Sequence, residues 1–137
     1  MRGYLLDTNV LSELLKKRPS PAVLERINAL PRESLSTSSI CITELRHGAA
    51  RHPQGGALWD RITSEVLSNF RILPLDQVEA ERAGDLLAIL ESRGKTIGVE
   101  DVLIGATALV HELVVATRNR KHFDRIEGLT LESWWEI

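Results

Sequence analysis

The sequence of 137 residues has a single cysteine, Cys41, and only 4% aromatic residues. One cysteine excludes an intramolecular disulfide framework and favours a reducing compartment. No apolar run reaches the roughly 18–20 residues of a membrane helix and no export signal is visible, so we expect a cytoplasmic protein with no membrane partner. Neither sign of charge dominates, because 17 Lys and Arg stand against 19 Asp and Glu, for a net charge of −2. This balance argues against a protein that coats nucleic acid by bulk attraction, but it leaves room for a nucleic-acid enzyme with a local site.

The rest of the composition is that of an ordinary globular protein, with 43% hydrophobic and 26% charged residues. The length suits one domain over residues 1–137, and we find no internal repeat or linker. Short apolar segments predict strands at 4–7, 71–75, 113–117 and 129–131, and residues 34–39 are expected to form a strand despite their polarity. Helical spacing of apolar residues predicts helices at 9–18, 22–30, 40–50, 58–70, 77–91 and 99–111. This alternation indicates an α/β protein, a three-layer α/β/α sandwich around a mostly parallel sheet.

The carboxyl ends of the expected strands are the first place to look for a site. In parallel sheets, ligands bind beyond these ends, where the strand order reverses. Asp7 ends the first expected strand, and residues 117–119 follow the fourth. Asp7 has an alternative explanation as a helix cap or turn acid, although Thr8 is our expected N-cap of the first helix.

A second acid, Glu44, lies in the helix predicted at 40–50. Its neighbours three and four residues away are Ile40, Cys41, His47 and Gly48. Three of these four are apolar or small, which predicts that Glu44 lies on the inward face of its helix. A glutamate rarely enters a core unless it is paired, coordinated or protonated, so a functional role and a partly buried salt bridge to an arginine both stay open.

A third acid, Asp101, lies in the first turn of a strongly apolar helix and shares its face with Gly105 and Ala108, small residues that allow another segment to approach. Helix capping is the alternative, because the helix dipole favours an acid at this end. Three inward carboxylates in one small domain would repel each other, and a divalent cation would relieve that repulsion. Hard oxygen ligands favour Mg²⁺ or Mn²⁺. The histidines and Cys41 show no zinc-ligand spacing, and Cys41 is most simply a small buried hydrophobe.

A magnesium site built from carboxylates suits phosphoryl chemistry. The sequence has no Gly-rich phosphate loop, which argues against an NTPase or a dehydrogenase and leaves a phosphate within a polynucleotide as the more natural substrate. A basic cluster follows the fourth expected strand, formed by Arg118, Arg120, Lys121 and Arg125. These residues would hold backbone phosphates, or they simply form a solvated polar connection over residues 118–124.

Three segments resemble, in order along the chain, the signatures of PIN-domain nucleases, and in particular of the VapC-type toxins of bacterial toxin–antitoxin pairs. They are residues 6–10 (LDTNV), 43–49 (TELRHGA) and 97–106 (IGVEDVLIGA). Residues 115–119 (VATRN), with His122 and Phe123, resemble the fourth segment of that family. The first or second motif alone is weak evidence, whereas four in sequence over essentially the whole chain are specific.

The resemblance implies a PIN-type α/β/α fold and a Mg²⁺- or Mn²⁺-dependent endoribonuclease. It implies that Asp7, Glu44 and Asp101 form the metal site, with Asp7 and Asp101 as the most direct ligands. Asn119 stands where the family often has a further acid, and it would assist through the metal or a water. That departure leaves open whether one metal or two are bound, with Asp124 as a possible late carboxylate. The resemblance further implies a VapB-like antitoxin whose segment occludes the active site, and a homodimer.

Two other functions stay open at this point. One is a non-catalytic PIN-like module that binds RNA or a protein, against which the three intact acids argue. The other is a phosphoacceptor receiver or an aspartyl phosphatase, but no second Asp stands two residues after Asp7 and no Lys-Pro pair follows a late strand. The pair Trp134 and Trp135 is expected in the core, with a dimer contact or an antitoxin contact as alternatives.

Overall fold

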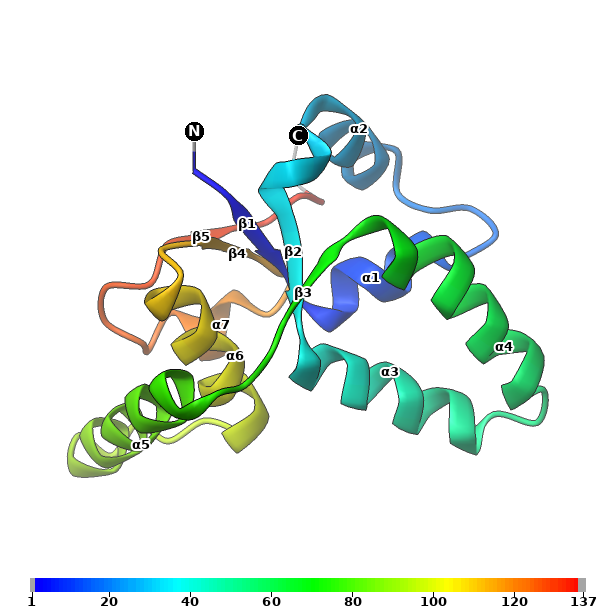
Figure 1. Ribbon diagram of the computed structural model, residues 1–137. Helices are drawn as coiled ribbons and strands as arrows, with labels where there is room; N and C mark the ends of the chain where they lie inside the picture. Colours follow the sequence, from blue (N-terminus) through cyan, green and yellow to red (C-terminus); the bar gives the residue numbers. More distant parts are fainter. Residues whose placement is uncertain (1, 136–137) are drawn as a thin grey trace.

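The computed structural model describes residues 2–135 and contains a five-stranded sheet with helices on both faces (Figure 1). The strands are β1 (Tyr4–Leu6), β2 (Leu35–Ser38), β3 (Arg71–Leu73), β4 (Val114–Ala116) and β5 (Leu131–Glu132). They lie in the order β3-β2-β1-β4-β5, and every adjacent pair is parallel. The predicted α/β class and parallel sheet are therefore confirmed.

The helices form the two outer layers of the sandwich. They are α1 (Thr8–Leu14), α2 (Pro21–Ala29), α3 (Ser39–Arg51), α4 (Gly55–Arg61), α5 (Gln77–Ser92), α6 (Val99–Val110) and α7 (Arg120–Phe123). In Figure 1, α1, α3 and α4 lie to one side of the sheet, and α5, α6 and α7 lie to the other. None of the helices within residues 2–135 has the length and apolarity to cross a bilayer.

The central strands are buried because helices cover both of their faces. Leu5 and Leu6 of β1 have no exposed surface, as expected for a strand inside a parallel sheet. The polar strand β2 is buried as well, and Thr37 Oγ1 donates to the Leu6 carbonyl at 2.9 Å, which satisfies its hydroxyl. Ser38 then caps α3 by accepting from the Cys41 backbone N–H at 3.2 Å.

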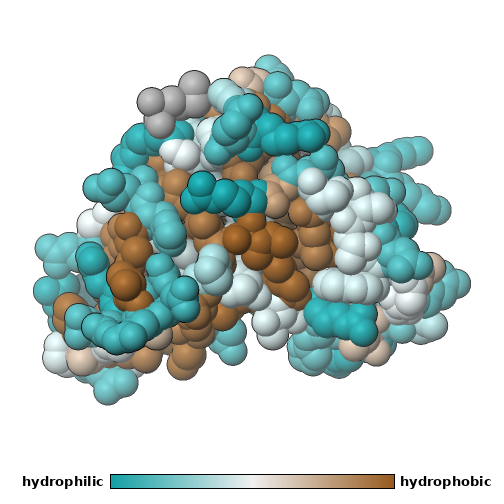
Figure 2. Space-filling model, in the orientation of Figure 1, coloured by the Kyte–Doolittle hydropathy of each residue, from teal (hydrophilic) through white to brown (hydrophobic). Residues whose placement is uncertain are grey.

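Edge strand β3 is the least covered part of the sheet. Ile72 of this strand is 39% exposed. On the face drawn in Figure 2, apolar side chains reach the surface near the centre, where β3 lies in Figure 1, and more hydrophilic surface surrounds them. The remainder of the core is continuous between the two helical layers.

Four local predictions were wrong. Asp7, and not Thr8, is the N-cap of α1. The helix expected at 58–70 instead starts at Gly55, where a side-chain Cβ would overlap the Ala49 carbonyl oxygen, and it breaks into α4, a π-helical turn and a 3₁₀ turn. The polar connection 118–124 contains α7, and the last strand is 131–132 in place of 129–131. The expected core position of Trp134 is confirmed, since its exposed fraction is 3%.

The strand order places the reversal of the sheet between β1 and β4. From the central strand β1 the chain continues to β2 and β3 on one side, and later adds β4 and β5 on the other. The backbone N–H of Asp7 donates to the Ala116 carbonyl at 3.0 Å, which joins the carboxyl ends of these two neighbours. This is the place where a parallel sheet forms a binding crevice.

Candidate active site

An open pocket of about 400 Å³ lies at the carboxyl ends of β1 and β4. Its lining includes all four residues predicted for the site, which are Asp7, Glu44, Asp101 and Asn119. The other lining residues are Thr8, Asn9, Ser12, Glu13, Lys16, Arg118 and Trp135. Asp124 is not among them. The fold thus brings together side chains from the end of β1, from α3, from α6 and from the segment after β4.

Asp7 is the buried centre of this pocket, with an exposed fraction of 5%. Its Oδ1 accepts from the Thr8 backbone N–H at 2.8 Å, so Asp7 caps α1 and also faces the pocket. Its Oδ2 accepts from Thr117 Oγ1 at 2.8 Å and from Asn9 Nδ2 at 3.1 Å. Burial raises the pKa of Asp7 and the nearby charge of Asp101 adds to that rise, while the bonds from Thr117 and Thr8 oppose it.

Thr117 and Asn9 tie the segment after β4 to Asp7. The fully buried Thr117 hydroxyl accepts from the Asn119 backbone N–H at 2.9 Å while it donates to Asp7. Asn9 Oδ1 accepts from the Arg118 backbone N–H at 3.0 Å. Hydrogen bonds from the backbone N–H groups of Arg118 and Asn119 therefore hold the start of this segment close to Asp7.

Glu44 lines the pocket from α3, but the prediction that it lies on an inward helix face was wrong. Glu44 is exposed, and α3 buries a stripe at Cys41, Leu45 and Ala49 beside it. Its Oε1 accepts from Thr8 Oγ1 at 2.9 Å, and one of its oxygens lies within 4.8 Å of an Asp7 oxygen. Partial desolvation raises the pKa of Glu44, and the charges of the other two acids raise it further.

Asp101 is half-buried, with 21% of its side chain exposed. Its Oδ2 lies 2.9 Å from Nδ1 of His122, a contact that was missed at the level of sequence, and the same nitrogen lies 2.9 Å from Asn119 Nδ2. The spacing of three residues between Asn119 and His122 was the available signal, because such residues share a helix face. Gly105 does allow the close approach expected of it, since a Cβ there would lie 2.6 Å from Ile126 Cδ1.

The donor set fits a hard divalent cation. Cys41 Sγ also lies within 4.8 Å of ligand atoms of Asp7 and Glu44. Burial raises the pKa of the Cys41 thiol, which keeps it neutral, and its Sγ lies 3.7 Å from the Leu6 carbonyl. The available donors are therefore carboxylate oxygens whose mutual repulsion a cation would relieve, which is the chemistry of Mg²⁺ or Mn²⁺ sites.

The basic cluster predicted after β4 is divided by the structure. Only Arg118 lines the pocket. Arg125 instead donates to the Thr96 carbonyl at 2.8 Å, and Arg120 and Lys121 are exposed on α7. A second basic residue, Lys16, reaches the pocket from the end of α1 and had no signal in the sequence, because it is far from Arg118 along the chain.

Comparison with known proteins identifies the family of this chain. The family model described as the PIN domain matches residues 4–129. The VapC ribonuclease Y4jK of Sinorhizobium fredii is 41% identical, over 96% of this chain and 97% of that protein. The crystal structure of FitAcB from Neisseria gonorrhoeae superposes with a TM-score of 0.89 at 33% identity, over 98% of this chain and 99% of that one. A toxin–antitoxin complex from Klebsiella pneumoniae gives a TM-score of 0.72 at 30% identity, over 98% and 100% of the two chains. The chain therefore belongs to the PIN domain family.

Proposed function

We propose that this protein is a divalent-metal-dependent endoribonuclease and the toxin of a toxin–antitoxin pair. The observation that carries the proposal is the convergence of Asp7, Glu44 and Asp101, from three separate elements, on one open pocket at the strand-order reversal. The ribonuclease name of the relative from Sinorhizobium fredii and the toxin–antitoxin complex from Klebsiella pneumoniae support it.

Asp7 and Asp101 would hold the cation most directly, with Glu44 beside them and Asn119 as a neutral amide. When bound, a divalent cation makes water more acidic and stabilises charge on a phosphoryl group, which is what hydrolysis of an RNA phosphodiester requires. The contribution of the chain is to hold the ligands in place. Hydrogen bonds to both Asp7 oxygens fix its carboxylate, and His122 orients Asp101.

We further propose an antitoxin partner of the VapB type and a homodimer, both on the family resemblance. Light scattering of the purified chain, alone and with the product of a neighbouring small reading frame, measures both. A monomer at micromolar concentration would contradict the homodimer, and failure to form a complex would contradict that antitoxin.

The catalytic proposal is tested by cleavage of RNA with purified protein. We expect EDTA to abolish cleavage, and Asp7→Asn or Asp101→Asn to reduce its rate by at least about 100-fold, because each removes a carboxylate ligand. Asp124→Asn is the matched control, since this acid lies outside the pocket lining, and it should cleave at the wild-type rate. Cleavage that survives EDTA, or that is normal in the Asp7 and Asp101 variants, would refute the mechanism.

The remaining alternative is a non-catalytic module that binds RNA or a partner protein. Calorimetric titration with Mg²⁺ and Mn²⁺ separates the two functions. An enzyme should bind one of these ions near millimolar concentration, and this binding should weaken in Asp7→Asn. No binding in that range would favour the module.

A further inference from the structure

Glu13 is a buried carboxylate in the pocket wall that has no part in the proposed chemistry. Its side chain is 6% exposed. It accepts from Lys16 Nζ at 2.9 Å, from the Ser20 backbone N–H at 2.9 Å and from Trp135 Nε1 at 3.3 Å. One buried acid therefore positions both a lysine and a tryptophan that line the pocket.

Trp135 in turn supports Arg118. The guanidinium carbon of Arg118 lies 5.0 Å from the centre of a Trp135 ring, within the range of a cation–π contact. Lys16 and Arg118 are the two basic residues of the pocket lining, and both have exposed side chains. Two cations from distant parts of the chain are thus placed in one wall by Glu13 and Trp135.

This wall extends away from the acids along α1. Asp7 is the N-cap of α1, and Lys16 lies two residues after Leu14, the last residue of that helix. A helix of seven residues is about 10 Å long, so the backbone of Lys16 lies at the opposite end of α1 from Asp7. The acids would repel the phosphates of RNA on either side of the bond that is cleaved, whereas Lys16 and Arg118 would attract them.

We propose that Lys16 and Arg118 form a phosphate-binding subsite for a single RNA strand, next to the carboxylate centre, and that Glu13 and Trp135 position these two cations. The inference rests on the proposed ribonuclease function and deepens it. A pocket of about 400 Å³ suits one strand, whereas a double helix is bound across a much broader surface. The alternative is that the hydrogen bonds of Glu13 only hold the end of α1 against the C-terminal segment and have no role in RNA binding.

The salt dependence of RNA binding separates the two explanations. Binding of an unstructured, fluorescently labelled oligoribonucleotide is measured by anisotropy in EDTA, over a series of salt concentrations. Removal of one phosphate-binding cation should lower the slope of log K against log salt by about 0.7 for a single strand. We expect that decrease in Lys16→Gln and in Arg118→Gln, and about twice as much in the double variant.

Two matched controls accompany these variants. Lys17→Gln removes the exposed neighbour of Lys16, which does not line the pocket. Arg46→Gln removes an arginine that lies 4.9 Å above the Trp59 ring, the same stacking outside the pocket. Both controls should keep the wild-type slope. Equal decreases in the controls, unchanged slopes in the Lys16 and Arg118 variants, or no measurable wild-type binding at low salt would each overturn the proposal.

The positioning residues have their own test. Trp135→Leu should reduce the salt slope because it removes the aromatic face under Arg118, and Trp135→Phe should restore most of it. Glu13→Gln should raise KM for RNA cleavage several-fold with little change in kcat. An unchanged slope in Trp135→Leu, or a loss confined to kcat in Glu13→Gln, would contradict the positioning role.

Failure of this inference and failure of the proposed function give different results. Binding in EDTA does not depend on cleavage, so normal slopes together with metal-dependent cleavage would refute the subsite alone. Reduced slopes without any cleavage would refute the enzyme and retain the RNA subsite. Variants that weaken binding of a partner protein but keep the wild-type RNA slope would also overturn the subsite.

Discussion

The two consecutive tryptophans at the end of the described chain, Trp134 and Trp135, each contact one glutamate and one arginine, but they lie in different environments. Trp134 Nε1 donates to Glu132 at 3.1 Å, and Trp135 Nε1 donates to Glu13 at 3.3 Å. An arginine stacks on each ring. The guanidinium carbon of Arg26 lies 5.9 Å from the Trp134 ring centre, and that of Arg118 lies 5.0 Å from the Trp135 ring centre.

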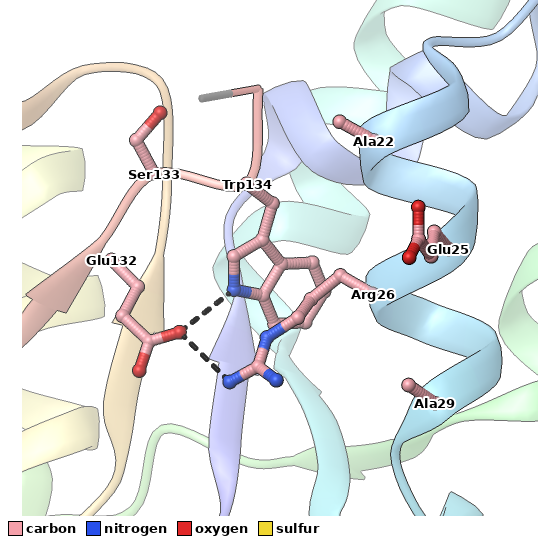
Figure 3. Close-up of a pocket in the computed structure, with 7 residues that line it drawn as sticks. All are labelled: Ala22, Glu25, Arg26, Ala29, Glu132, Ser133 and Trp134. Atoms are coloured by element: carbon pink, nitrogen blue, oxygen red, sulfur yellow. Dashed lines mark hydrogen bonds and ion pairs between the residues drawn. The ribbon is translucent and has the colours of Figure 1, made fainter. Parts of the chain in front are cut away.

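The two clusters differ in whether a carboxylate neutralises the arginine that stacks on the tryptophan. Arg26 Nη2 lies 3.2 Å from Glu132 Oε1, the oxygen that also accepts from Trp134, so that cluster is closed on itself (Figure 3). Glu13 is paired with Lys16, and none of the carboxylates within residues 2–135 forms an ion pair with Arg118. The same residue types therefore have different roles at the two tryptophans. Around Trp134 they form a set of contacts that neutralise each other, whereas around Trp135 they leave Arg118 charged at the edge of an acidic pocket.

The largest expected difference is in the contribution of the two tryptophans to stability. Trp134 is 3% exposed and packs edge-on against Tyr4, with ring centres 5.5 Å apart. Trp134→Ala should lower the free energy of unfolding by about 3–5 kcal/mol, because it removes a large buried side chain. Trp135→Ala should cost less than about 1.5 kcal/mol, since this ring is only half-buried. Urea unfolding measures both, and equal losses would show that the two clusters do not differ as described.

A smaller effect, and one that depends on pH, is expected at Glu13. Its hydrogen bond with Lys16 is the main cause that lowers its pKa below the ordinary value of 4.5. A carboxylate with a lowered pKa in the folded state stabilises the protein above the unfolded-state pKa, and this contribution is lost as the pH falls through the folded-state pKa. Glu13→Gln should therefore cost about 1–2 kcal/mol near neutral pH, reduced by the solvent around Lys16, and less below pH 4.5.

Unfolding in urea from pH 7 to pH 3 measures this dependence. Glu33→Gln, at an exposed position, is the control and should have no effect at any pH. A loss in Glu13→Gln that stays constant down to pH 3 would show that the ionised carboxylate is not what stabilises this wall.

The sequence was sufficient for the sheet and for the meeting of the acids. Strands such as Tyr4–Leu6 are local apolar segments, and the rule of strand-order reversal then brings Asp7 close to the segment after β4. Those inferences need only local pattern and topology. The direction of Glu44 needs more, because the α3 sequence is compatible with two neighbouring buried stripes. Packing against the rest of the molecule selects Cys41, Leu45 and Ala49, and leaves Glu44 at the rim.

The wall of Lys16 and Arg118 could not have been predicted for a different reason. Glu13 and Trp135 are 122 residues apart, and nothing in the pattern around either one indicates the other. The basic residues after β4 looked alike in sequence, but Arg125 is held by the Thr96 carbonyl and only Arg118 turns to the pocket. Contacts of this kind are set by the whole fold.

The smallest expected effect concerns the two arginines. Arg26 donates to the Tyr4 hydroxyl at 2.8 Å in addition to its ion pair with Glu132, but its side chain is 39% exposed, so solvent weakens the pair. Arg26→Gln should cost about 1 kcal/mol of unfolding free energy. Arg118→Gln should stay within about 0.5 kcal/mol of wild type, because the Arg118 side chain stacks on Trp135 in an exposed position. The combination of normal stability with a reduced salt slope for RNA would assign Arg118 to binding. If Arg118→Gln instead destabilises the protein as much as Arg26→Gln, then both arginines stabilise the fold, and the contacts of Trp135 have the same structural role as those of Trp134.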